Sequence, residues 1–253
     1  MKTIQLPSLM LSSMLLIGSL FFVACSKDDD VVSEEPTFSV ELKTNNTFGK
    51  MLVDDKGKTL YFLEKDVDGT SACSGGCLNV WPIFFDETFT AGPGLEANLF
   101  ATITRADGQK QTTYKGWPLY KFQQDTKAGD ILGDNKNGFF LAKPDYSVFF
   151  GNKGTGRYLV DALGKTLYTF VDDLDGTSNC NGGCAAVWPA FFTEPPIVPT
   201  PLKSSDFYKI TRTDSQFQVT FVKKPVYFFS KDEVRGDVKG TLANPKFTVL
   251  SVN

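Results

Sequence analysis

The feature that most constrains the fold of this chain is an internal duplication. Residues 73–85 read CSGGCLNVWPIFF and residues 180–192 read CNGGCAAVWPAFF, so the second stretch follows the first at an offset of 107 (180 minus 73). At that offset, residues 49–85 align with residues 156–192 without a gap, and 23 of the 37 positions are identical. Such self-similarity indicates two tandem copies of one structural unit.

We place copy 1 at residues 37–147 and copy 2 at residues 148–253. Each copy contains a fainter repeat, in which a Tyr is followed by four residues and then an Asp. We expect the Tyr and the residue two positions later to share one face of a strand, and the Asp to accept hydrogen bonds from turn N–H groups. A ligand-binding role for this motif is the alternative. The eight motif residues are Tyr61 and Asp66, Tyr120 and Asp125, Tyr168 and Asp173, and Tyr227 and Asp232.

Short segments punctuated by Gly, Pro and Asp predict an all-β fold. Residues 51–53, 54–57 and 59–63 read as strand, turn and strand, with Gly57 supplying the positive φ of a tight turn. Alternation with a period of two is frequent, and no window keeps a helical period over three turns. We therefore predict a small β-sandwich or barrel-like domain for each copy, with contacts mainly inside each copy, so that copy 2 folds by itself.

The amino end has the pattern of a lipoprotein signal peptide. After Lys2, residues 9–23 are almost continuously apolar, and the sequence FVAC that ends at Cys25 resembles a bacterial lipobox. The following SKDDD resembles the surface-export signal of Bacteroidota lipoproteins. We therefore expect removal of residues 1–24, a lipid on Cys25, a flexible acidic tether over residues 25–36, and a location at the outer membrane, exposed on the cell surface.

The composition excludes several functions. The chain has no histidine, which removes His-ligated zinc, Ser-His-Asp and Cys-His nucleophiles, and a His general base. Its formal net charge of −3 argues against nucleic acid and anionic lipid headgroups as partners. We expect no catalytic residue, cofactor or bound metal, and a monomer whose ligand or protein partner the sequence does not identify.

Four cysteines remain after lipidation of Cys25, and they allow three pairings. The duplication favours Cys73 with Cys77 and Cys180 with Cys184, because each copy is then stapled within itself. The glycine pairs between the cysteines discourage a helix, and a secreted surface is oxidising enough to keep a disulfide. A Cu(I) site and a redox-active dithiol are the alternatives.

Acidic loops precede both cysteine pairs. Asp66 and Asp68 lie in DVDGTS, and Asp173 and Asp175 lie in DLDGTS. Each loop is similar to half of a calcium loop but lacks the third acidic position and the closing Glu. We favour a capped turn over a calcium site.

The motif order resembles one known family. Leu-Tyr-x-aromatic-x-x-Asp, followed by Ser-x-Cys, Gly, Cys-Ala and Trp-Pro, is similar to the secreted lipoprotein repeats with a Tyr-x4-Asp motif. The resemblance covers nearly all of residues 48–253, although copy 2 departs in its later half, where Lys224 replaces Trp117. It implies an extracellular address and a repeat architecture, with no assigned reaction.

We therefore predict a surface-anchored, non-enzymatic binding or structural module of the envelope. One alternative is an accessory to extracellular electron or copper traffic through the cysteine pairs. Another is glycan capture through exposed aromatic side chains, with Trp117 as the candidate ligand contact.

Overall fold

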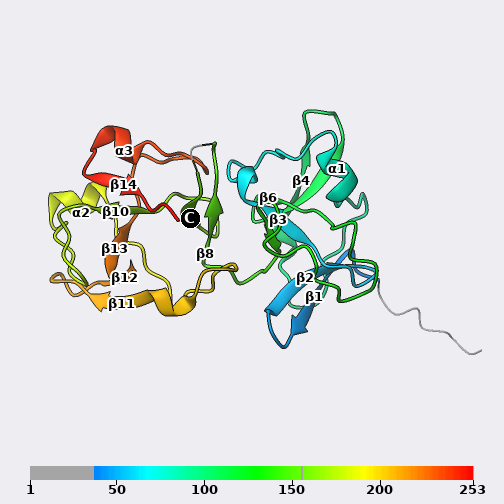
Figure 1. Ribbon diagram of the computed structural model, residues 1–253, viewed down its shortest axis with the longest axis horizontal. Helices are drawn as coiled ribbons and strands as arrows, with labels where there is room; N and C mark the ends of the chain where they lie inside the picture. The colour runs from blue at the N-terminus through cyan, green and yellow to red at the C-terminus, as the bar shows by residue number, and fades with distance from the viewer. Residues whose placement is uncertain (1–36, 155, 253) are drawn as a thin grey trace, which may run out of the picture. The chain divides into compact units, whose positions relative to one another are not determined.

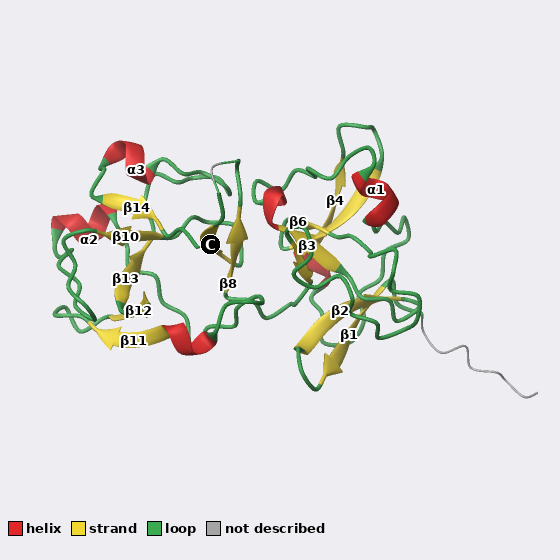
Figure 2. Cartoon of the chain, viewed as in Figure 1, coloured by secondary structure: helices red, strands yellow, loops and turns green. Residues whose placement is uncertain are grey.

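The computed structural model describes residues 37–154 and 156–252. The predicted signal peptide, Cys25 and the tether lie outside the described residues. Strands joined by long loops dominate the described part, and its helices are short (Figure 2). The all-β prediction is confirmed. None of the described helices is long and apolar enough to cross a membrane.

Copy 1 begins with an antiparallel hairpin and continues into short antiparallel pairs (Figure 1). Strands β4, β5 and β6 form one sheet, and β3 pairs with β7. The elements are β1 (Val40–Asn45), β2 (Gly49–Asp54), β3 (Tyr61–Leu63), the 3-10 helix η1 (Glu64–Asp66), α1 (Cys77–Val80), the 3-10 helix η2 (Ala97–Leu99), β4 (Phe100–Thr104), β5 (Lys110–Tyr114), β6 (Trp117–Pro118) and β7 (Phe139–Leu141).

Copy 2 has a similar order of elements, in which β8 pairs with β9 and the other strands join into a sheet with the order β11-β12-β13-β10-β14. Copy 1 has the corresponding strands, with the join made by an isolated antiparallel bridge between Tyr61 and Tyr120. The elements of copy 2 are β8 (Val148–Gly151), β9 (Tyr158–Asp161), β10 (Tyr168–Phe170), α2 (Gly183–Val187), the 3-10 helix η3 (Ser204–Asp206), β11 (Phe207–Thr211), β12 (Phe217–Phe221), β13 (Lys224–Tyr227), α3 (Gly240–Ala243) and β14 (Phe247–Val249).

A tight turn follows β2, as the sequence predicts. One carboxylate oxygen of Asp54 accepts the backbone N–H groups of Lys56 at 3.0 Å and Lys58 at 2.8 Å. Gly57 takes a φ of +70°, which a residue without Cβ adopts at low cost. The Asp side chain and the Gly thus define the turn between β2 and β3.

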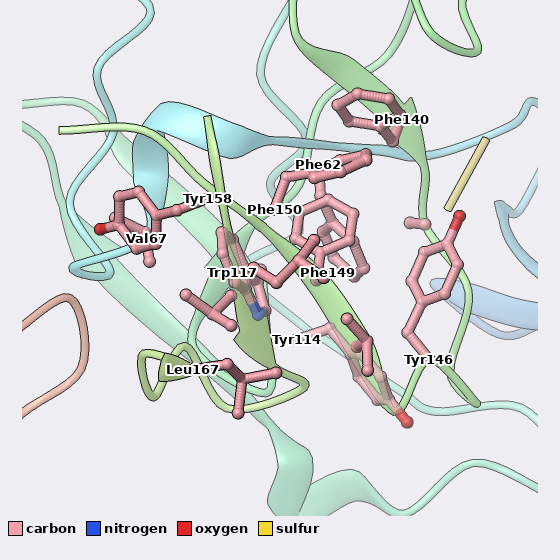
Figure 3. Packing of buried hydrophobic residues seen from close by; sticks show 14 of the residues in the cluster. Phe62, Val67, Tyr114, Trp117, Phe140, Tyr146, Phe149, Phe150, Tyr158 and Leu167 are labelled. Carbon is pink, nitrogen blue, oxygen red and sulfur yellow. The ribbon is translucent and has the colours of Figure 1, made fainter. Parts of the chain in front are cut away.

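One buried hydrophobic cluster extends over both copies, and others lie within a single copy. Phe62 and Trp117 of copy 1 pack on Phe149 of β8, with ring centroids 5.8 and 4.7 Å apart (Figure 3). One buried cluster contains these rings together with side chains from late in copy 2, and Thr37–Asn253 form one compact unit. Contacts between elements still lie mainly inside each copy, as expected, and the aromatic residues at the start of copy 2 join the cores of the two copies.

Candidate functional site

The two Tyr-x4-Asp motifs of copy 1 form reciprocal side-chain hydrogen bonds. The Tyr61 hydroxyl donates a hydrogen bond to Asp125 (2.6 Å to Oδ2), and the Tyr120 hydroxyl donates one to Asp66 (2.6 Å to Oδ2). The main chains of the two tyrosines are also bonded, with Tyr61 N to Tyr120 O at 2.8 Å and the reverse bond at 3.0 Å. Each motif therefore completes the other, and the exchange joins the two halves of the copy.

Copy 2 contains the same exchange. Tyr168 donates to Asp232 and Tyr227 donates to Asp173, both at 2.7 Å. All eight motif side chains are buried. The duplication thus repeats a polar arrangement inside the protein as well as the strands around it.

The second oxygen of each motif aspartate holds a loop. Asp66 Oδ1 accepts the N–H of Ala72 at 2.7 Å, and Asp125 Oδ1 accepts the N–H of Leu132 at 2.9 Å. Tyr120 and Phe122 lie together in one buried cluster, as their spacing predicts. The turn-capping role expected for the aspartates is present, and each carboxylate accepts one bond from a loop and one from a tyrosine.

An arginine that we did not single out from the sequence extends this network in each copy. In copy 1, Arg105 donates to Gln111 Oε1 at 2.8 Å, to the carbonyl of Cys73 at 2.7 Å, and to the Ser71 hydroxyl. Arg212 makes the same three kinds of contact in copy 2. The available signal was the recurrence of an Arg at the repeat offset, because 212 minus 105 is 107.

Burial controls the electrostatics of the network. It raises the pKa of Asp66 to about 7, against the opposing effect of the bonds from Tyr120 and the Ala72 N–H. It also raises the pKa of Asp125, Asp173 and Asp232 and of all four motif tyrosines. The tyrosines therefore stay protonated as donors, and the arrangement acts as a buried scaffold.

Both cysteine pairs are disulfides within their own copy, as predicted. Cys73 is bonded to Cys77 with a Cα–Cα distance of 5.5 Å, and Cys180 to Cys184 with 5.2 Å. Trp81 shares a buried cluster with Cys73, so the loop packs on the tryptophan that follows it. Each sulfur atom is therefore bonded to the other sulfur of its own pair.

The acidic loop of copy 1 forms a capped turn. Asp68 Oδ1 accepts the N–H of Thr70 at 2.9 Å and its hydroxyl at 2.7 Å. Asp66 points to Tyr120 and the Ala72 N–H instead of joining Asp68 around a common point. Across residues 37–154 and 156–252, no three Cys, Asp or Glu side chains gather as a metal site.

Trp117 is not the exposed ligand contact that the sequence suggested. Its side chain is 2 % exposed, and its indole Nε1 donates to the carbonyl of Ala162, in copy 2, at 2.9 Å. The guanidinium of Arg235 lies 4.7 Å from the centre of its ring. The structure corrects the expectation of an exposed ligand contact, because this tryptophan packs between the copies.

Arg235 joins the copies in a second way, which the sequence did not reveal. Its guanidinium donates to the carbonyls of Val67 at 2.8 Å and Lys115 at 2.9 Å, both in copy 1. Ala128 stands at the corresponding position of copy 1, as Lys224 stands at that of Trp117. At these two positions, the copies differ where they meet.

Three segments of the chain match the model of a secreted repeat of unknown function, at residues 44–84, 101–140 and 151–191. Each holds one Tyr-x4-Asp motif, so the repeat of this family is half of the 107-residue copy. The matches stop at residue 191, short of the expected 253, and the motif of Tyr227 lies beyond them. Comparison with curated proteins and with solved structures gives no match.

Proposed function

The chain belongs to a family of secreted repeats of unknown function, and from that premise we propose that it is a non-enzymatic binding or structural module of the cell envelope. A lipid on Cys25 holds it at the outer membrane, and the acidic tether places residues 37–253 on the cell surface. The lipobox-like FVAC and the SKDDD that follows support this address.

The single observation that carries the proposal is the internal use of the motif. Several side chains with strongly perturbed pKa values, such as Asp66 and Tyr120, are bonded to one another inside the protein. Perturbed groups are candidates for catalysis when they line a cleft, and structural networks perturb pKa values in the same way. Because these residues build the scaffold, the surface of the module is left to act on other molecules.

The two alternative functions have less support. Copper or electron traffic through the cysteines requires reduction of both disulfides, since a thiolate and not a disulfide binds Cu(I). Glycan capture through Trp117 requires a side chain that packs between the copies to turn outward. Neither role uses the molecule in the state described.

The address is tested on whole cells with Cys25→Ala and with deletion of residues 27–30. We expect Cys25→Ala to lose fatty-acid labelling and membrane association, because it lacks the lipid acceptor. The deletion should keep the label and lose digestion by external protease. Lys43→Ala, at an exposed cation, is the control and should leave both unchanged. Protection of the unaltered protein from external protease contradicts the surface location.

A further inference from the structure

A pocket of about 330 Å³ lies beside the disulfide of copy 1. Its apolar wall includes Leu63, Trp81, Phe139 and the Cys73–Cys77 bridge. The indole Nε1 of Trp81 is buried without an acceptor among the described residues. The volume falls within the range of small-molecule sites, which combine apolar walls with a few polar groups.

Three polar side chains of the pocket lining have no partner in the described part of the chain. Lys65, Ser74 and Asn137 are exposed, and the hydrogen bonds and ion pairs of the structure include none of their side-chain atoms. Asn137 also takes a φ of +54°, an uncommon backbone conformation for a residue with a side chain. The pocket therefore presents one cation and two neutral hydrogen-bonding groups next to an apolar wall.

Copy 2 lines the corresponding place with different side chains. Phe170 stands where copy 1 has Leu63, and its ring stacks on Phe247 at a centroid distance of 4.3 Å. Phe247 is the counterpart of Phe139, since the two rings stack on Trp188 and Trp81 at 3.7 and 3.8 Å. The larger side chain thus adds a ring to the aromatic stack where copy 1 has Leu63.

Copy 2 also differs at the polar positions of the pocket. Asp172, at the position of Lys65, binds Lys246 at 2.7 Å. Asn181, at the position of Ser74, accepts from the Thr213 hydroxyl at 3.1 Å. Pro245, whose side chain forms no hydrogen bond, stands at the position of Asn137, because the N–H groups of Phe247 and Phe139 each bond the carbonyl three residues earlier. The polar groups that face the pocket in copy 1 are therefore paired or replaced in copy 2.

We propose that this pocket, formed by Leu63, Lys65, Ser74, Asn137 and the Cys73–Cys77 disulfide, binds a small molecule with a compact apolar body and one anionic group. The body lies against Leu63 and the disulfide, and the anion faces Lys65. This inference rests on the proposed role as a binding module and names the class of ligand.

The test uses naphthalene-2-sulfonate as the anionic probe and naphthalene-2-methanol as its neutral counterpart. Residues 37–253, which contain every described contact of the fold, are titrated with each probe and followed by amide NMR. We expect saturable shifts at Lys65, Ser74 and Asn137 with the sulfonate. Leu63→Phe should abolish them by placing a bulkier ring in the wall of the pocket, and Phe170→Leu, the matched change in copy 2, should leave them unchanged.

A second variant isolates the charge. Lys65→Gln should raise the Kd of the sulfonate about two- to fivefold, as expected for an exposed ion pair, and leave that of the alcohol unchanged. Absence of saturable shifts in the unaltered protein overturns the proposal, as do unchanged shifts in a folded Leu63→Phe variant. Because the titration does not involve Cys25, its failure is separate from a failure of the proposed surface address.

Discussion

Folding is coupled to protonation at single residues, most strongly at Asp66. Burial raises the pKa of this carboxyl to about 7, from 3.8 in the unfolded chain. The native state therefore binds a proton more tightly than the unfolded state between about pH 4 and 7, and stability falls as the pH rises through that window. Asp125, Asp173 and Asp232 are shifted in the same direction and add to the slope.

We predict that Asp66→Asn reduces this pH dependence. The amide oxygen takes the place of Oδ1 and accepts the Ala72 N–H, the NH2 group takes the place of Oδ2 and donates to the Tyr120 hydroxyl, and no titrating charge remains. The free energy of unfolding, measured by urea denaturation, should gain about 1 kcal/mol or more relative to the unaltered protein on going from pH 5 to pH 8.

Asp86→Asn is the control for the pH measurement. Ser39 and the backbone N–H of Thr88 hold the pKa of Asp86 below its usual value, so this carboxyl stays ionised from pH 5 to pH 8 in both states. Its removal should change stability equally at the two pH values. An Asp66→Asn variant with the full original slope contradicts the assignment of the titration to Asp66.

The disulfide loops are the elements that the sequence predicts best, and their energetic weight follows from their length. The bond between Cys73 and Cys77 closes a loop of five residues, so it removes little conformational freedom from the unfolded chain. The loop also contributes the Cys73 carbonyl, which accepts from Arg105 at 2.7 Å. The disulfide therefore positions the Cys73 carbonyl, which is one acceptor of the buried network.

We predict that Cys73→Ser combined with Cys77→Ser costs on the order of 2 kcal/mol, from loop entropy, and does not abolish folding. Urea denaturation measures the cost. The matched pair Cys180→Ser and Cys184→Ser should cost a similar amount, because the loop length and the contact with Arg212 are the same. Loss of folding in either double variant contradicts the view of a local clip.

Local patterns predicted local elements. The turn at Gly57, the shared cluster of Tyr120 and Phe122 and both disulfides follow from spacings of a few residues, and each is present. The partner of each motif aspartate was not predictable in this way. Tyr61 meets Asp125, 64 residues away, because two halves face each other, and no single strand or turn carries that information.

The same limit explains Trp117 at the level of the whole molecule. If the two copies are assumed to be independent domains, a tryptophan that only one of them has suggests a ligand contact. In the structure it packs on Phe149 and under Arg235, so its asymmetry reflects its position between the copies. Differences between repeats are ambiguous until the interface between the repeats is known.

The shared core gives a prediction for the isolated second copy. Residues 148–253 expressed alone expose Phe149 and Phe150, which are buried in the full protein. We expect a poorly dispersed amide NMR spectrum for this fragment and a well-dispersed one for residues 37–253. In the longer protein, Arg235→Ala should cost about 1–3 kcal/mol, since the carbonyls of Val67 and Lys115 lose their buried donor.

Lys127→Ala, at an exposed cation in copy 1, is the control and should change stability by less than about 0.5 kcal/mol. A folded fragment with a cooperative unfolding transition contradicts the conclusion that the copies share one core. So does an Arg235→Ala variant as stable as the unaltered protein.

The reciprocal exchange between motifs has a consequence for how such chains can grow. The tyrosine of each half-copy donates to the aspartate of the other half. An unpaired half at the end of a chain therefore has a tyrosine without an acceptor and a carboxylate without a donor. Both groups lie at buried positions, where a missing partner costs free energy. Gene duplication should therefore add motifs to this architecture in pairs, so that a stable chain contains an even number of them.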